Sequence, residues 1–162
     1  MYKYSEMKTG IFGTIYILAY EMELVDISLS EDDWEVANKK YEASYAPEDA
    51  TLVEIKNQLE EYFRGERKTF SFPIKFRGTV FQEQVWNELL NIPYGETRCY
   101  ADIANAIDNP KAVRAVGQAN RKNPIPIVVP CHRVIGKDKS LTGYSGTRTD
   151  LKEKLLELEG VL

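Results

Sequence analysis

The sequence predicts an α/β (α+β) protein with a small sheet-containing N-terminal domain at residues 1–77 and a mostly helical C-terminal domain at 78–162 that holds a helix-turn-helix. Residues 10–29 are rich in β-branched and aromatic side chains, whereas apolar residues after position 80 recur at helical spacing. Gly78 follows an extended stretch and marks the boundary. At 162 residues the chain can bury a core without disulfide or metal support.

The N-terminal elements are strands followed by a helix. Residues 10–20 and the alternating run 24–29 predict a small antiparallel sheet. A helix is then expected from Thr51 to near Gly65, because apolar residues recur at its spacing. Those residues are Leu52, Ile55, Leu59 and, at the last position, Tyr62 or Phe63.

The C-terminal elements are short helices. Residues 81–90 predict one helix and residues 100–107 a second. Pro110 fits the first position of a third helix, whose inward residues would be Ala112, Val113, Val116 and Ala119. The second and third helices form the expected helix-turn-helix. A last helix over 150–160 would turn Leu151, Leu155 and Leu158 inward.

The segment between the third and last helices has unusual local chemistry. Residues 123–135 contain three prolines, which fix φ and remove backbone donors, so we expect this run to be extended and stiff. Residues 127–129 are apolar enough to be buried. Rigid, buried support is therefore predicted to end at Cys131.

Charge is divided unevenly along the chain. The net charge of −4 combines −8 over residues 1–60 with +4 over residues 61–162. Between Pro110 and Arg148 eight basic residues face only Asp138, a balance of +7 that would attract a polyanion. A solvated basic surface is the alternative, and charge alone favours it. The predicted third helix carries Lys111, Arg114, Gln118 and Arg121 on one face.

Cys131 and His132 are the first candidates for chemistry. A thiolate is a strong nucleophile, and a nearby imidazole or cation lowers the pKa of the thiol. The alternative is a buried structural thiol beside a core histidine, which the pair alone favours. Two cysteines and one histidine supply neither a disulfide framework nor the four ligands of a structural zinc site. Cys99 has no histidine beside it and is interpreted as structural.

No run of residues approaches the length of a membrane span, and the first residues lack the order of a signal peptide. We therefore expect no membrane association and an intracellular location, cytoplasmic, or nuclear in a eukaryote.

Five motifs in one order resemble the O6-alkylguanine-DNA alkyltransferase family. They are Phe81-Gln-Glu-Gln-Val-Trp86, Ile92-Pro-Tyr-Gly-Glu96, Tyr100-Ala-Asp-Ile-Ala104, Asn109-Pro-Lys-Ala-Val-Arg-Ala-Val-Gly117 and Pro130-Cys-His-Arg-Val134. Asn123-Pro-Ile-Pro126 precedes the last motif and Gly143-Tyr-Ser-Gly146 follows it. The resemblance covers about residues 78–160, and the first 77 residues look only generally like the family's variable N-terminal domain.

The resemblance implies roles for individual residues. Cys131 matches the alkyl acceptor, His132 its water-linked base, and Glu159 the carboxylate that orients the imidazole. Asn123 matches the residue that braces the turn, and Tyr100 the tyrosine that helps rotate the nucleotide and donates to the extruded base. Each residue also has a plain structural interpretation.

The resemblance also implies a DNA-binding face on the predicted third helix. Arg114 matches the arginine that fills the place of the flipped base, and small residues such as Ala115 let the helix approach the minor groove. Lys111, Gln118 and Arg121 would flank it. The pocket wall would be formed by Val134, Tyr144, Ser145 and Gly146. Asn120 departs from the apolar pocket residue of some members, which affects the range of alkyl groups.

The implied function is single-turnover DNA repair, in which the alkyl group of a flipped O6-alkylguanine passes to Cys131. It requires no cofactor and no metal, its partner is double-stranded DNA containing O6-alkylguanine, and the protein would act as a monomer. One alternative is a lesion-binding protein without transfer activity, against which the presence of Cys131 argues. Another is a Cys-His hydrolase, which would turn over repeatedly without DNA.

Overall fold

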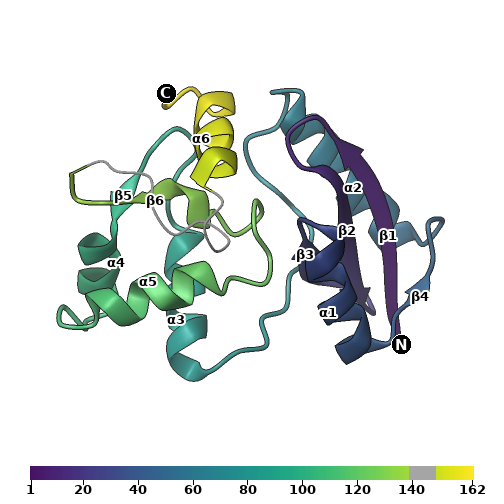
Figure 1. The fold of residues 1–162 in the computed structure, drawn as a ribbon, viewed down its shortest axis with the longest axis horizontal. Coiled ribbons are helices and arrows are strands. Elements are labelled where there is room, and N and C mark those ends of the chain that lie inside the picture. The colour runs from purple at the N-terminus through teal and green to yellow at the C-terminus, as the bar shows by residue number, and fades with distance from the viewer. Residues whose placement is uncertain (139–148) are drawn as a thin grey trace. The chain divides into compact units, whose positions relative to one another are not determined.

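The structure, a computed structural model, describes residues 1–138 and 149–162. The chain forms two compact units, Met1–Phe76 and Arg77–Leu162, and each is described by itself. Figure 1 shows the sheet in the first unit and the cluster of short helices in the second. The predicted fold class, a small sheet-containing domain followed by a mostly helical one, is confirmed.

The first unit contains a four-stranded sheet in the order β3-β2-β1-β4. The strands are β1 (Tyr2–Thr9), β2 (Gly13–Tyr20), β3 (Glu23–Ser28) and β4 (Ser44–Tyr45). Strands β2 and β3 pair antiparallel as predicted, and β1, which was not predicted from the sequence, pairs antiparallel with β2. Strand β4 pairs with β1 in parallel, so the expectation of a purely antiparallel sheet is wrong. Helix α1 (Glu31–Tyr41) lies between β3 and β4 in the chain. This helical connection allows β4 to run in the same direction as β1.

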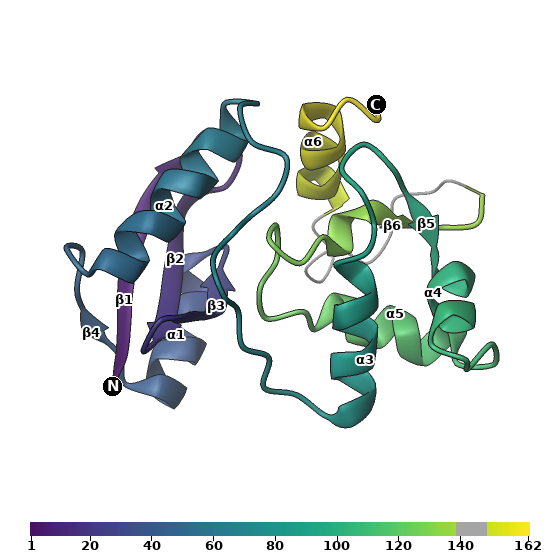
Figure 2. The same ribbon diagram turned by 180° about the vertical axis from the view of Figure 1, so that it is seen from behind.

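Two helices cover this sheet, and Figures 1 and 2 show them on opposite faces. Helix α1 places Trp34 against Tyr16 and Leu18 of β2. Helix α2 (Ala50–Phe63) buries the four apolar residues whose spacing predicted it. Helix α1 has no such signal, because Trp34 is its only buried residue; the Ser30 side chain starts it by accepting a hydrogen bond from Asp33 N.

The second unit contains short helices and a two-stranded parallel sheet. Its elements are α3 (Val80–Leu89), β5 (Arg98–Cys99), α4 (Tyr100–Ala106), α5 (Val113–Arg121), the 3₁₀ turn η1 (Cys131–Arg133), β6 (Val134–Ile135) and α6 (Thr149–Leu158). Trp86 Nε1 donates to Ala119 O at 2.8 Å and ties α3 to α5. Helices α4 and α5 pack against each other and are joined by a short turn, as the predicted helix-turn-helix requires.

Helix α5 begins later than the sequence predicts. It starts at Val113, and Pro110 lies in a turn that a hydrogen bond from Ala112 N to Asn109 O closes at 3.0 Å. A proline suits the second position of such a turn as well as the start of a helix, because both fix φ near −65°. Lys111 therefore precedes the helix. Val113 is 38% exposed rather than inward, and Asn120 takes its place on the buried face.

The expectation that residues 123–130 are extended is also wrong. Val129 N donates to Ile125 O at 2.9 Å, and Ile127 has a positive φ of 75°, so the segment folds into a compact turn. Proline fixes φ but not ψ, and the Asn123 side chain supplies hydrogen bonds that close the turn. The predicted burial of residues 127–129 is correct.

Within residues 1–138 and 149–162, no helix has both the length and the apolar character needed to cross a bilayer.

Candidate active site

Cys131 opens the 3₁₀ turn η1, directly after Pro130. Such a turn has three residues per revolution, so consecutive side chains diverge by about 120° instead of pointing in opposite directions as they do in a strand. Cys131, His132 and Arg133 are all buried, with exposed fractions of 2%, 0% and 7%. The turn thus brings a thiol, an imidazole and a guanidinium into one interior.

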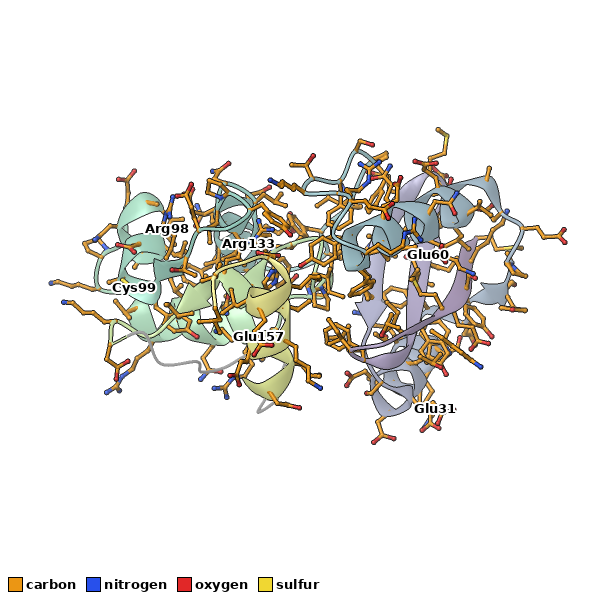
Figure 3. The ribbon with its side chains drawn as sticks, turned by 90° about the horizontal axis from the view of Figure 1, so that it is seen from above. Glu31, Glu60, Arg98, Cys99, Arg133 and Glu157 are labelled. Carbon is orange, nitrogen blue, oxygen red and sulfur yellow. The ribbon has the colours of Figure 1, made fainter. Side chains whose placement is uncertain are left out.

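One carboxylate serves both basic neighbours of the thiol. His132 Nε2 lies 2.7 Å from Glu159 Oε2, and Arg133 donates to the same carboxylate from Nε at 2.8 Å and from Nη2 at 3.1 Å. Arg133 Nη1 also donates to Ile92 O at 2.8 Å. Figure 3 labels Arg133 within the second unit. The structure therefore brings Glu159 to His132 and adds Arg133 as the group that fixes the carboxylate.

This network keeps His132 neutral near pH 7. Burial lowers the pKa of His132, and the positive charges of Arg133 and Lys152 lower it further, whereas Glu159 acts in the opposite direction. An ionised carboxylate can only accept a hydrogen bond, so Nε2 of the neutral ring carries the proton. Nδ1 is then the basic nitrogen.

The thiol itself is held in its protonated form. Burial raises the pKa of Cys131 to about 11. A hydrogen bond with the Asn123 side chain, the charge of Lys152 and the backbone N–H groups of Cys131 and His132 act against that rise by favouring the thiolate. A reaction of this sulfur at neutral pH therefore needs a base to take its proton.

Two asparagines hold the backbone around the thiol. Asn123 Nδ2 donates to Val129 O at 2.8 Å, and its Oδ1 accepts from Ile125 N at 3.0 Å, which braces the turn before Cys131. Asn120 of α5 is 1% exposed and donates from Nδ2 to Cys131 O at 3.3 Å. Helix α5 is thus bonded directly to the backbone of the candidate nucleophile.

Lys152 is the residue of this site that sequence reasoning missed. Its side chain is fully buried, its Nζ donates to Val134 O, and burial lowers the pKa of the ammonium group to about 8. On α6 the buried residues are Leu151, Lys152, Leu155 and Leu156, whereas Leu158, predicted to face inward, is half-buried. The sequence does contain a signal for this residue: Lys152 and Glu159 are charged residues seven positions apart on the apolar face of the predicted last helix.

Replacing Lys152 with methionine is expected to remove a rise in stability between pH 8 and pH 9. The folded protein releases the Lys152 proton near pH 8 and the unfolded chain near 10.5, so the unfolded chain binds more protons in between and stability grows with pH. The gain from pH 8 to pH 9 is about 1 kcal/mol in the free energy of unfolding, measured by urea denaturation. Above pH 9 Cys131, with its raised pKa, acts in the opposite direction. An equal rise in the free energy of unfolding of the unchanged protein and of Lys152→Met would mean that another titratable group causes it.

Tyr100 connects this interior to the helix-turn-helix. It is the first residue of α4 and is half-buried, and Lys152 Nζ lies 6.0 Å from the centroid of its ring. A Cβ at Gly117 of α5 would lie 3.9 Å from the ring, so the two helices meet at this tyrosine.

The predicted DNA-facing residues lie at the surface of α5. Arg114, Ala115, Gln118 and Arg121 are exposed, as is Lys111 in the turn before the helix. Val134 is fully buried in β6. The predicted pocket residues Tyr144, Ser145 and Gly146 lie outside the residues that the structure describes. In the described part of the chain, no group of three or more His, Cys, Asp or Glu side chains is placed to hold a metal ion.

Comparisons with known proteins cover both units. Residues 80–161 match the DNA binding domain of 6-O-methylguanine DNA methyltransferase, and residues 2–76 match its ribonuclease-like domain. The chain is 51% identical over 149 residues to the constitutive methylated-DNA–protein-cysteine methyltransferase of Bacillus subtilis, covering 92% of this chain and 90% of the relative. A Methanosarcina acetivorans methylated-DNA–protein-cysteine methyltransferase is 55% identical over 117 residues, which cover 72% of this chain and 74% of the relative.

Solved structures agree with these matches. The crystal structure of Mycobacterium tuberculosis O6-methylguanine methyltransferase has a TM-score of 0.88 at 42% identity, covering 98% of this chain and 93% of that one. The same organism's protein in complex with DNA has a TM-score of 0.87 at 40% identity, covering 97% and 92%. With both domains matched in order, the chain belongs to the 6-O-methylguanine DNA methyltransferase family.

Proposed function

We propose that this protein repairs DNA by direct damage reversal: it transfers the alkyl group of an O6-alkylguanine in double-stranded DNA to Cys131, once per molecule. The observation that carries the proposal is a buried thiol next to the Glu159–His132–Arg133 network. The relatives' names, methylated-DNA–protein-cysteine methyltransferase, support the same reaction.

The transfer is a displacement at the alkyl carbon. The sulfur of Cys131 forms a bond to that carbon while the bond from the carbon to O6 breaks, and its electron pair stays on the guanine oxygen. The thiol proton leaves through His132, and the guanine ring takes up a proton, so that unmodified guanine and a thioether result. A thioether offers water no easy leaving group, so the protein is consumed.

Around this step each residue has a separate task. His132 Nδ1 accepts the proton of Cys131, directly or through a water, because Glu159 holds the other nitrogen. Arg133 fixes the carboxylate, and Asn123 braces the turn. Tyr100 donates a hydrogen bond to the flipped base, and Val134 contributes to the pocket wall.

The exposed face of α5 meets the DNA. Arg114 takes the place of the extruded guanine in the stack, and Ala115 lets the helix approach the groove closely. Lys111, Gln118 and Arg121 contact the backbone around it. The DNA complex of the M. tuberculosis relative supports DNA as the partner. We further propose that the protein acts inside the cell, as a monomer on its lesion.

The direct test is intact-mass measurement after incubation with duplex DNA that contains one O6-methylguanine. We expect one added methyl group per chain, located on Cys131 by peptide mapping. Binding without a mass shift would favour a lesion-binding protein that only signals to other repair factors. Repeated turnover on a small substrate without DNA would favour a hydrolase.

DNA affinity is expected to fall as salt rises, because cations on the protein displace counterions from the phosphates. Reversing the charge of Lys111 or Arg121 removes one phosphate contact and should make the slope of log affinity against log salt less steep by about one. Fluorescence anisotropy of a labelled duplex between low and physiological salt measures that slope. Glu153, exposed on α6, provides the matched reversal to lysine that should not flatten the slope. An affinity that does not change with salt concentration would mean that these basic residues form a solvated surface and do not contact the phosphates.

A further inference from the structure

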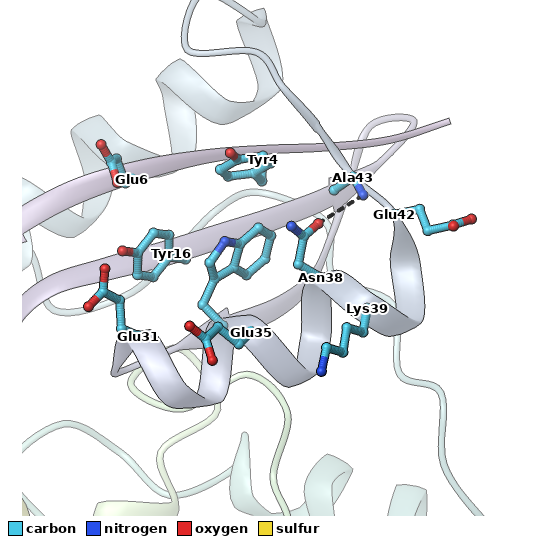
Figure 4. Close-up of a pocket in the computed structure, with 10 residues that line it drawn as sticks. Tyr4, Glu6, Tyr16, Glu31, Glu35, Asn38, Lys39, Glu42 and Ala43 are labelled. Atoms are coloured by element: carbon cyan, nitrogen blue, oxygen red, sulfur yellow. Dashed lines mark hydrogen bonds between the residues drawn. The ribbon is translucent and has the colours of Figure 1, made fainter.

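The N-terminal unit contains a groove that the proposed repair reaction does not use. It lies between helix α1 and strands β1 and β2 and has a volume of about 880 Å³ (Figure 4). The residues that matter for its chemistry are the aromatic Tyr4, Tyr16 and Trp34 and the acidic Glu6, Glu31, Glu35 and Glu42.

Packed rings form the floor of the groove. The rings of Tyr16 and Trp34 are stacked, with centroids 5.2 Å apart and planes within 4°. The Tyr4 ring lies 4.5 Å from Trp34. Tyr16 and Trp34 are buried at 8% and 7% exposure, so the floor is rigid and its rings cannot turn away from a ligand.

The rim is strongly negative. Four exposed glutamates surround the floor, and Lys39 is the one basic side chain among the groove's described residues. Burial raises the pKa of the Tyr16 hydroxyl, and the carboxylates of Glu31 and Glu6 raise it further. A phosphate or another anion is excluded from such a groove.

The Tyr16 hydroxyl is the feature that points to a ligand. Tyr16 is 8% exposed as a whole, but its hydroxyl oxygen is not among the enclosed atoms and opens into the groove, where no hydrogen bond joins it to any residue that the structure describes. Figure 4 shows this hydroxyl at the same end of the groove as the Glu31 carboxylate. The groove thus offers a positioned polar oxygen beside a carboxylate, above an aromatic floor.

We propose that this groove binds an arginine-bearing segment of a partner protein. A guanidinium is planar, lies flat on aromatic rings, and has N–H donors for both the Tyr16 oxygen and the glutamates. A metal ion does not fit, because no three acidic side chains of the described residues converge on one point. The charge of the groove selects the cation, and the ring floor selects arginine over lysine.

The length of the rim favours a peptide over a single free cation. Glu31 and Glu42 are separated by eleven residues at the two ends of α1, which corresponds to about 16 Å along a helix. An extended peptide covers that distance with about five residues. A second copy of this chain is the competing occupant, because it too exposes arginines such as Arg64, and sedimentation distinguishes it from a partner protein.

The probe is the peptide Arg-Gly-Arg-Gly-Arg, titrated into the full-length protein at low salt and followed by calorimetry and by the indole N–H resonances. We expect saturable binding that shifts the Trp34 signal, and at least several-fold weaker binding of the same peptide with citrulline in place of arginine. Tyr16→Phe, which keeps the ring, and the double variant E31Q/E35Q should each lower the affinity, the latter by about fivefold.

The matched control is E60Q/E157Q, which removes the same charge from exposed positions outside the groove; Figure 3 labels Glu31, Glu60 and Glu157. It should bind the arginine peptide as the unchanged protein does. Equal losses in both double variants, equal binding of the citrulline peptide, or no binding would overturn the proposal. So would sedimentation showing that the groove instead joins two copies, with a dimer that E31Q/E35Q dissolves. Because none of these readouts involves alkyl transfer, the result is independent of the repair function.

Discussion

Replacing Cys131 with serine is expected to abolish alkyl transfer while DNA binding stays within about twofold of the unchanged protein. A hydroxyl is a far weaker nucleophile than a thiol, and its proton is much harder for His132 to remove. The exchange preserves side-chain size, and the DNA-facing residues are on α5, so the protein should still dock. Intact mass after incubation with methylated duplex measures transfer, and anisotropy measures binding.

Cys99 provides the control for this prediction. It lies in β5, outside the network of Glu159, and Cys99→Ser should retain one transferred group per chain. Labelled methyl groups in excess of one equivalent of unchanged protein would exclude a single-use acceptor. Transfer that survives in Cys131→Ser would move the acceptor to another side chain.

Arg114→Ala is expected to slow repair of duplex DNA by one to several powers of ten, each on the order of 1.4 kcal/mol. If Arg114 fills the gap left by the flipped guanine, its loss adds to the cost of opening the duplex, which is a few kcal/mol. Reaction with free O6-benzylguanine needs no opening and should change little. Single-turnover rates with both substrates measure the two steps separately.

Arg121→Ala is the matched control, because Arg121 is also an exposed arginine of α5. Its loss should weaken binding but leave the rate at saturating protein nearly unchanged. If Arg114→Ala slowed the reaction equally with both substrates, Arg114 would be part of the base pocket or needed for folding.

Sequence periodicity is sufficient to predict those helices and strands that bury a regular stripe of apolar side chains. Helix α2 follows its four apolar residues, and α3 follows Val85, Trp86 and Leu89. Strand β1 gives no such signal, since only Ser5 and Met7 are buried among its charged residues. The turn at 123–130 depends on hydrogen bonds from the Asn123 amide, which no local propensity encodes.

The residues of the candidate site also fall into two groups, those that the sequence reveals and those that only the structure reveals. Cys131 and His132 are adjacent in the chain, so the sequence alone reveals them, and the resemblance adds Glu159 from a distant helix. Arg133 could be expected only to contribute positive charge, because its bidentate contact requires the final packing of η1 against Glu159. Lys152 was missed because a lysine in an amphipathic helix is expected to face water.

The order of these residues along the chain has a consequence for protein synthesis. The ribosome makes the Cys131 turn before α6, which brings Lys152, and before Glu159. Until those residues emerge, Arg133 lacks its carboxylate and the thiol lies outside the network that supports its reactivity. A protein that acts once gains from this sequence of events, since the thiol of Cys131 is activated only in a chain that has already folded.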